Sequence, residues 1–408
     1  MSPLPLVQKR SFVVTLGLLT GMAALTVDMS LPAVPAMVDA LATSLSSGQQ
    51  IVGIFMAGMA AGQIPAGLVS DRVGRLPVLY AGMGLFAVGA TVAALANDIN
   101  LMLAARFVQG FGAASAIVLS RAIVRDIATG KEAAKLMALM TMIFTVAPVI
   151  APSIGAILIA QWGWRAPFML IAAAGFVMLA AIRRNIPETH SPIVGQHPVQ
   201  QLLSSVAEFF SHRQSVFGLL LIILPPAGFM SMIAISAALV VEIYGYSVVE
   251  FGLIFATAGI SILIGSAINR LLVTRLDAIQ VIGLGVALFA ISGAQLLVIA
   301  WLNHAPFAWL WGNMCLFMFA VAIAMPNATV LSLDPLPRIA GVASSIIGTL
   351  QNIIGAAGAL LGAVIYDGTI RNSVIVIGVA GMLVAFVFLL KPIICGEIVH
   401  HPEELARD

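Results

Sequence analysis

The chain has 408 residues, of which 61% are hydrophobic and only 9% are charged, with 19 basic and 17 acidic side chains. Soluble domains average about 25% charged residues, so this composition excludes an ordinary soluble protein and favours a membrane protein. The formal net charge of +2 gives no indication of a nucleic-acid partner.

Twelve apolar segments follow one another along the chain, and each can cross a bilayer, which takes about 20 largely apolar residues. The first lacks a small-residue cleavage site and is followed at once by another apolar run, so we expect a span rather than a signal peptide. The connections are short, which predicts an all-α integral membrane protein of twelve transmembrane helices. The predicted spans are Phe12–Met37, Gln50–Val69, Leu76–Ala96, Leu101–Ile123, Leu136–Ala160, Ala166–Ile182, Val216–Ile243, Phe251–Val273, Ala278–Trp301, Pro306–Leu331, Gly341–Tyr366 and Ser373–Leu390.

The longest polar interval divides the spans into two groups of six. We predict an N-terminal six-helix bundle over residues 1–184, a cytoplasmic linker over 185–215, and a C-terminal bundle with a short tail over 216–408. Within the linker, Val199–Phe210 is amphipathic and is predicted to lie along the membrane surface.

The histidines and cysteines favour neither a metal site nor a disulfide framework. The linker holds His190, His197 and His212, but without acids at ligand spacing. The two cysteines, Cys315 and Cys395, also lack metal-type spacing. We therefore expect no metal ion and no cofactor, and the sequence offers no nucleophile–base constellation for a membrane-embedded enzyme.

Basic residues are distributed very unevenly between the two ends of the predicted spans. With the N-terminus inside, almost all lysines and arginines lie at or near the cytoplasmic side, and only Arg165 and Arg371 lie outside. This is the distribution that the positive-inside rule requires, so we expect both termini in the cytoplasm.

The turn between predicted spans 2 and 3 contains two glycines, one acid and two bases within nine residues. Residues 67–75 read Gly-Leu-Val-Ser-Asp-Arg-Val-Gly-Arg. Such a turn suits an interfacial site whose charges hold neighbouring helix ends together. The stretch resembles the loop 2–3 signature of the major facilitator superfamily, with Leu76 where a further base is usual.

A weaker copy of this turn lies at the end of predicted span 8. Gly265 and Arg270 repeat the spacing of Gly67 and Arg72, and Asn269 replaces the acid. Two six-helix pseudo-repeats are the arrangement expected of major facilitator transporters, with the substrate site between them near the midplane.

Two charged residues lie inside predicted spans, where each costs several kcal/mol unless it is paired or functional. Asp28 is the only acid well inside a predicted span. Arg106 lies in predicted span 4, which runs in the opposite direction, at a similar depth in the bilayer. One interpretation is an ion pair that joins spans 1 and 4. The other is a carboxylate whose proton occupancy is set by the arginine and the substrate.

Several further motifs resemble the bicyclomycin-resistance and CflA-type drug exporters of the same superfamily. Asp28–Pro35 is similar to the run that closes their span 1, and Arg106–Ala113, which includes Gln109, to their span 4 motif. Arg121–Asp126 resembles the cytoplasmic end of that span, and Ala147–Gly155 resembles their span 5 antiporter motif. The resemblance is dense from residue 28 to 168 and rests on span count and the weak repeat beyond residue 215.

The resemblance implies a proton-coupled antiporter of the bacterial inner membrane that exports small amphiphilic drugs, phenicol- or bicyclomycin-like, by alternating access. Its partners would be the drug, protons and the lipid bilayer, with no nucleic acid, and the chain would act as a monomer. The alternative is export of an endogenous metabolite or polyamine by the same machinery.

The candidate site residues fall into four groups. Proton coupling is assigned to Asp28 and Arg106. The conformational latch, expected to hold the outward-facing state, comprises Gly67, Asp71, Arg72, Gly74, Arg75, Arg125 and Asp126. The antiporter-motif helix is expected to bend at Pro148 and Pro152 and to pack closely at Gly155. Candidate substrate-binding residues are Asp28, Arg106, Gln109, Phe229, Met230, Asn313, Phe317, Gln351 and Asn352, although the apolar ones can equally face lipid.

Overall fold

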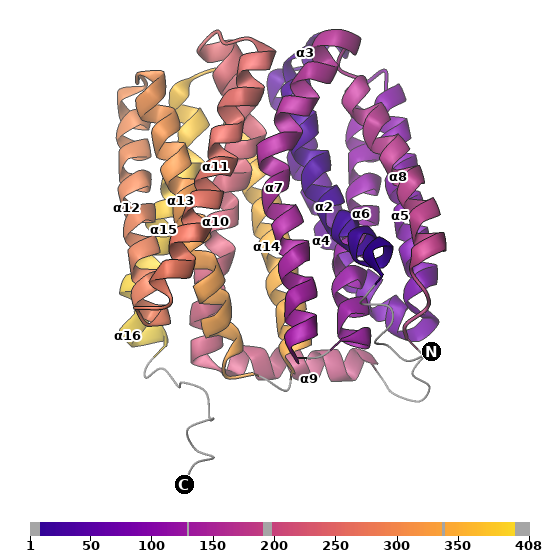
Figure 1. Ribbon diagram of the computed structural model, residues 1–408. Helices are drawn as coiled ribbons and strands as arrows, with labels where there is room; N and C mark the ends of the chain where they lie inside the picture. The colour runs from indigo at the N-terminus through magenta and orange to yellow at the C-terminus, as the bar shows by residue number, and fades with distance from the viewer. Residues whose placement is uncertain (1–8, 129, 191–197, 337–338, 396–408) are drawn as a thin grey trace. The chain divides into compact units, whose positions relative to one another are not determined.

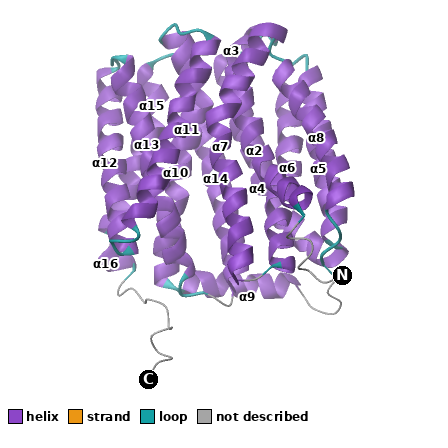
Figure 2. Ribbon diagram, in the orientation of Figure 1, coloured by secondary structure: helices purple, strands orange, loops and turns teal. Residues whose placement is uncertain are grey.

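The computed structural model describes residues 9–128, 130–190, 198–336 and 339–395, and these residues form helices and connecting loops with no β-strand (Figures 1 and 2). The elements are α2 (Arg10–Ser30), η1 (Leu31–Ala33), α3 (Val34–Ala40), α4 (Leu45–Val73), α5 (Arg75–Leu95), α6 (Ile99–Ile127), α7 (Gly130–Trp162), α8 (Ala166–Asn185), α9 (Pro198–Ser211), α10 (Arg213–Ala237), η2 (Ala238–Ile243), α11 (Val248–Leu272), α12 (Ala278–Leu302), α13 (Phe307–Leu333), α14 (Ala340–Ile365), α15 (Ile370–Leu389) and α16 (Lys391–Ile394).

Eleven of the helical segments in the described residues are long and apolar enough to cross a membrane. The 33-residue helix α7 adds a further segment at the position of predicted span 5, and its described apolar stretch is Val149–Trp162. The all-α prediction is confirmed, and the helices are consistent with the predicted twelve.

Two of the spans change helix type part-way along. Span 1 passes from α2 through the 3₁₀ turn η1 into α3, where Pro32 and Pro35 each remove a backbone donor that an α-helix would use. The helix α10 continues into the π-helical segment η2.

The described helices divide into two compact units by their internal contacts. The first, called here the N-terminal unit, contains α2–α8 together with residues 233–259 and 359–368. The second, the C-terminal unit, contains the rest of the helices from α9 onward. The predicted boundaries at residues 184 and 215 follow the order of the spans along the chain. Grouping by contacts instead also places residues 233–259 and 359–368 in the N-terminal unit.

Small residues let the helices of the N-terminal unit approach one another closely. A β-carbon added at Gly110 on α6 would lie 2.0 Å from the Phe55 carbonyl oxygen of α4, and one at Gly58 would lie 2.2 Å from that of Phe107. Against α5, a β-carbon added at Gly112 of α6 would lie 2.4 Å from the Gly82 carbonyl oxygen. Backbone contact of this kind is the usual means of helix association in membranes, where lipid removes the hydrophobic driving force.

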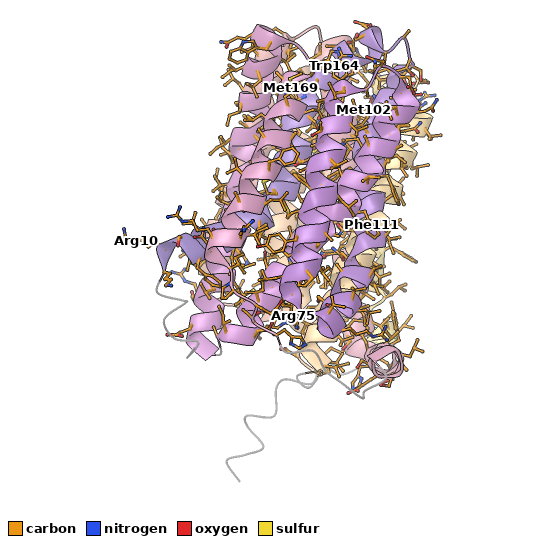
Figure 3. The ribbon with its side chains drawn as sticks, turned by 90° about the vertical axis from the view of Figure 1, so that its right-hand side faces the viewer. Arg10, Arg75, Met102, Phe111, Trp164 and Met169 are labelled. Carbon is orange, nitrogen blue, oxygen red and sulfur yellow. The ribbon has the colours of Figure 1, made fainter. Side chains whose placement is uncertain are left out.

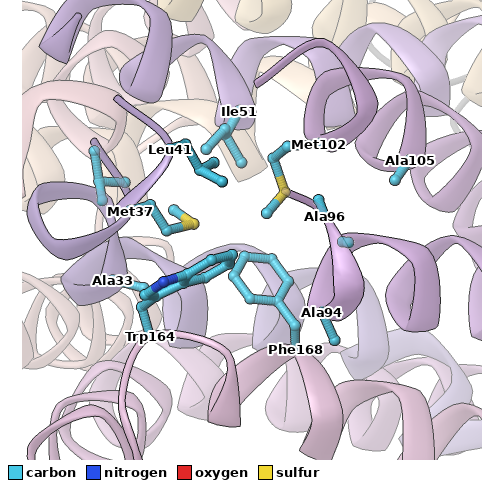
Figure 4. Packing of buried hydrophobic residues seen from close by; sticks show 12 residues of the cluster. Ala33, Met37, Leu41, Ile51, Ala94, Ala96, Met102, Ala105, Trp164 and Phe168 are labelled. Carbon is cyan, nitrogen blue, oxygen red and sulfur yellow. The ribbon is translucent and has the colours of Figure 1, made fainter. Parts of the chain in front are cut away.

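An apolar cluster fills one end of the N-terminal unit (Figure 4). Trp164 and Phe168 meet edge to face with their ring centroids 6.2 Å apart, and Met37, Ile51 and Met102 pack around them. Figure 3 shows Trp164 at one end of this bundle and Arg75 at the other. We call these the Trp164 end and the Arg75 end.

Candidate transport site and conformational latch

The Arg75 end of the N-terminal unit is held by a compact group of charged and polar side chains. Arg75 is the first residue of α5 and is buried; its Nε donates to Asp126 Oδ2 of α6 at 3.0 Å. Its Nη1 donates to Ser70 Oγ of α4 at 2.9 Å and also to the Asp71 carboxylate. We call Ser70, Asp71, Arg75 and Asp126 the Arg75 cluster; it joins α4, α5 and α6.

The chain reaches this cluster through Gly74, whose φ of 99° lies in the left-handed region that favours glycine. The turn therefore needs this glycine, as the motif predicts. Of the other predicted latch residues, Arg72 and Arg125 are exposed, and neither enters the ion pairs found among the described residues. The nearest atom to a β-carbon at Gly67 would be Val118 Cγ1 at 3.8 Å, so this glycine is not required by close packing in this structure.

Three residues that follow α8 also contact the cluster, and the sequence did not indicate them. Glu188 accepts hydrogen bonds from the backbone N–H groups of Arg75 and Leu76, both at 2.9 Å. The Thr189 hydroxyl donates to Asp126 Oδ2 at 3.1 Å, and His190 Nε2 lies 3.3 Å from the Asp71 carbonyl oxygen. The sequence feature that could have indicated this contact is Glu188 directly after Pro187, a short distance beyond predicted span 6.

Arg106 is fully buried on α6 and makes its contacts within the N-terminal unit. Its Nη1 donates to Gln109 Oε1 at 2.8 Å, and its Nε donates to the Ile51 carbonyl oxygen at 3.5 Å. The guanidinium carbon lies 4.5 Å from the centre of the Phe55 ring, a favourable cation–π arrangement.

Asp28 is only 3% exposed on α2, yet it makes no ion pair or hydrogen bond with the residues that the structure describes. The structure thus brings Asp28 and Arg106 into the same helical unit without forming the ion pair that one interpretation of the sequence required. Other polar atoms in this interior are also buried without hydrogen-bond partners in the described part of the chain: Thr26 Oγ1, both amide atoms of Gln49, Arg106 Nη2 and Gln109 Nε2.

The antiporter-motif helix α7 packs directly beside the turn that carries Asp28. A β-carbon at Gly155 would lie 2.2 Å from the Met29 carbonyl oxygen, so glycine is needed for this approach. On another side of α7, Ser153 Oγ donates to the Gly252 carbonyl oxygen of α11 at 3.2 Å, and Pro152 is buried. The side chain of Pro148 lies outside the described part of the structure.

Candidate cavity residues of the second half all belong to the C-terminal unit and differ in their surroundings. Phe317 is fully buried with its ring 4.8 Å from that of Phe289, and Asn313 donates to the Trp309 carbonyl oxygen and to Gln295. Both placements favour helix packing within the unit. Half-buried positions are held by Phe229, Met230, Gln351 and Asn352.

A family model described as Major Facilitator Superfamily matches residues 16–359 of this chain. The chain belongs to this superfamily. Curated relatives include the "Bicyclomycin resistance protein homolog" of Haemophilus influenzae, 29% identical and aligned over 85% of this chain and 87% of the relative. The "Multidrug resistance protein MdtL" of Escherichia coli is also 29% identical, over 92% of this chain and 95% of the relative.

Solved structures share the fold. A bacterial homologue of the human lysosomal transporter Spinster superposes with a TM-score of 0.75 over 93% of this chain and 96% of its own, at 15% identity. A D-xylose–proton symporter gives a TM-score of 0.71 over 96% of this chain and 99% of its own, at 17% identity. This major facilitator protein is therefore a multi-pass membrane transporter, with multidrug- and bicyclomycin-resistance proteins among its relatives, as its motifs predicted.

Proposed function

We propose that this transporter exports small amphiphilic drugs from the cytoplasm in exchange for protons, with Asp28 as the coupling carboxylate. The observation that carries the proposal is a buried acid without an ionic partner among the described residues, in a chain related to drug-resistance proteins. A buried carboxylate without a partner is costly to leave ionised, so its proton occupancy changes when water or a cation reaches it. Access from alternate sides of the membrane would supply that change.

Arg106 supports the proposal as a fixed positive charge in the same helical unit. Its position is set by Gln109, the Ile51 carbonyl oxygen and the Phe55 ring rather than by Asp28. The arginine can therefore keep its place while Asp28 gains or loses a proton. In this mechanism it acts on Asp28 and on substrate through its field, and Asp28 remains the group that exchanges the proton.

The Arg75 cluster would act as the conformational latch of the transport cycle, at the cytoplasmic ends of the spans, with both termini on that side. A buried guanidinium shared by two carboxylates on different helices holds those helix ends in one arrangement. The latch would stabilise the outward-facing state, as its motif implies. We propose that the protein works as a monomer in the inner membrane of a bacterium.

Transport into proteoliposomes tests the coupling. With an imposed pH gradient, the wild type should concentrate a phenicol or bicyclomycin against its gradient, and Asp28→Asn should lose this uphill transport while still exchanging substrate. Asp39→Asn, which neutralises an exposed acid on the neighbouring helix α3, is the matched control and should transport normally. Uphill transport by Asp28→Asn would refute the coupling role, and proton-driven transport of a polyamine but no drug would favour the alternative substrate class.

A further inference from the structure

We propose that Gln49 and Tyr366 form a hydrogen-bonding subsite at the Trp164 end, which binds uncharged hydroxyl or amide groups of the substrate. The inference rests on the proposed drug export and adds a point of substrate contact to Asp28 and Arg106. Both residues belong to the N-terminal unit, Gln49 on α4 and Tyr366 directly after α14. Neither was among the residues that the motifs indicated.

Gln49 carries a fully buried amide without a partner in the part of the chain that the structure describes. Its exposed fraction is 0%, and neither Oε1 nor Nε2 makes a hydrogen bond with a described residue. An amide can donate two hydrogen bonds through its nitrogen and accept further ones at its oxygen. Burying such a group unpaired destabilises a folded protein. The amide at this position therefore calls for an explanation other than the stability of this arrangement.

Tyr366 repeats this situation just beyond the end of α14. It is 7% exposed, and its hydroxyl also lacks a hydrogen-bond partner among the described residues. Burial, together with the negative charges of Glu242 and Asp367, raises the pKa of Tyr366 to about 12. The phenol therefore keeps its proton at neutral pH and is a neutral donor and acceptor.

Contacts between α4 and α14 place Gln49 at the interface of these two helices. The Ser46 hydroxyl donates to the Ala363 carbonyl oxygen at 2.6 Å. Deeper along the same pair of helices, a β-carbon at Gly53 would lie 2.6 Å from Leu360 Cγ. Gln49 follows Ser46 by three residues and precedes Gly53 by four, and residues at this spacing share one face of a helix. The buried amide therefore lies on the face of α4 that meets α14.

Tyr366 lies at the same end of this interface. It follows Ala363 by three residues, directly after Ile365, the last residue of α14. The helix α3 packs on a neighbouring face of α4, because a β-carbon at Gly48 would lie 2.6 Å from Val38 Cγ2. While these contacts hold, α3, α4 and the end of α14 surround the two unpaired polar groups.

In the proposed transport cycle, separation of α4 from the end of α14 would open this interface to the substrate. A hydroxyl, carbonyl or amide group of the drug would then fill the hydrogen bonds that Gln49 and Tyr366 do not make with the protein. Both side chains are neutral, so the subsite favours uncharged hydrogen-bonding groups such as the hydroxyl and amide groups of a phenicol. It also discriminates against molecules without such groups, which would leave its polar atoms unpaired.

Replacement of Gln49 by methionine, which is of similar size but lacks the amide, separates substrate binding from a structural role. Gln49→Met should lower the affinity for chloramphenicol about three- to tenfold, the effect of losing one neutral hydrogen bond. Without drug it should unfold at a higher temperature than the wild type, because an apolar side chain replaces an unpaired buried amide. Equilibrium dialysis of labelled chloramphenicol with the purified full-length protein measures affinity, and thermal unfolding in detergent measures stability.

A second variant, Tyr366→Phe, removes only the hydroxyl and should give the same pair of changes. The matched control is Gln214→Met in the C-terminal unit. Gln214 is also buried, but its amide donates to the Leu331 carbonyl oxygen at 3.2 Å. Because that hydrogen bond is made in the protein, the control should unfold at a lower temperature and bind chloramphenicol with unchanged affinity.

Unchanged chloramphenicol affinity in either Gln49→Met or Tyr366→Phe would refute the subsite and leave the proposed drug export standing. A lower affinity together with a lower melting temperature would make these residues part of the packing, and would also refute it. If the wild type itself binds no chloramphenicol, the phenicol substrate fails and the subsite fails with it. Proton coupling is tested separately through Asp28.

Discussion

Arg106 has the largest of the fully buried side chains in the described structure, and its surroundings explain how a charge can stay there. The guanidinium is held by one side-chain amide, one backbone carbonyl and one aromatic face, and none of these is a formal counter-charge. Burying a charge in such a site destabilises the protein unless hydrogen bonds offset the lost hydration. Gln109 therefore helps to keep Arg106 in place.

We expect Gln109→Ala to destabilise the protein by about 1.5–3 kcal/mol, because it removes a buried hydrogen bond to a charged group. Thermal unfolding in detergent measures the effect. Thr91→Ala is the matched control, since among the described residues the Thr91 hydroxyl bonds to the Ala87 carbonyl oxygen of its own helix and to no other group. Equal melting temperatures for the two variants would mean that the Arg106–Gln109 bond contributes no more than a helix-internal one.

At the scale of helices, the contact between α2 and α7 joins the acid-bearing span to the antiporter-motif helix. The approach depends on Gly155, which lies against the backbone of Met29, the residue next to Asp28. Backbone atoms cannot move aside as the end of a flexible side chain can. The motif glycine thus has a packing reason next to Asp28, the proposed coupling residue.

Gly155→Ala should force α2 and α7 apart and lower transport at least about tenfold, since packed cores tolerate added atoms poorly. Initial rates of drug efflux, normalised to the amount of inserted protein, give the measurement. Gly84→Ala on α5 is the control, because no described atom beyond the surrounding backbone of its own helix lies within 4 Å of the added carbon. Transport by Gly155→Ala at the rate of the control would show that α2 and α7 need not approach so closely during the cycle.

At the scale of the molecule, the N-terminal unit includes two short pieces of the second half of the chain. The Ser46 hydroxyl at the start of α4 donates to the Ala363 carbonyl oxygen near the end of α14 at 2.6 Å. A β-carbon on Gly53 would also meet Leu360. In the alternating-access cycle that we propose, such contacts between helices of the two halves would form and break each time.

Cross-linking Ser46→Cys to Ala363→Cys with a short thiol-specific reagent, in the chain without native cysteines, should stop transport, and reduction should restore it. The control pair is Thr15→Cys with Asn185→Cys, whose native side chains share a 2.9 Å hydrogen bond between α2 and α8 of the first half. That pair joins helices expected to move together, so its cross-link should be tolerated. Continued transport with the Ser46–Ala363 link in place would contradict separation of these helices.

The sequence by itself determined the membrane class, the helices and the superfamily. These depend on composition, on apolar runs about 20 residues long and on local motifs, and all are properties of neighbouring residues. The need for glycine at position 74 was also visible, because a tight turn between two spans requires its backbone freedom.

Only the tertiary structure decided which side chains meet. Depth along a span suggested that Asp28 and Arg106 could pair, but Arg106 instead contacts Gln109 on its own helix and the Phe55 ring of α4. Phe317 and Asn313 are residue types that often line a cavity, but here their contacts are those of a helix interface. Glu188 lies 113 residues from the N–H group that it caps. Sequence patterns carry local periodicity, whereas such contacts depend on how helices far apart in the chain pack against each other.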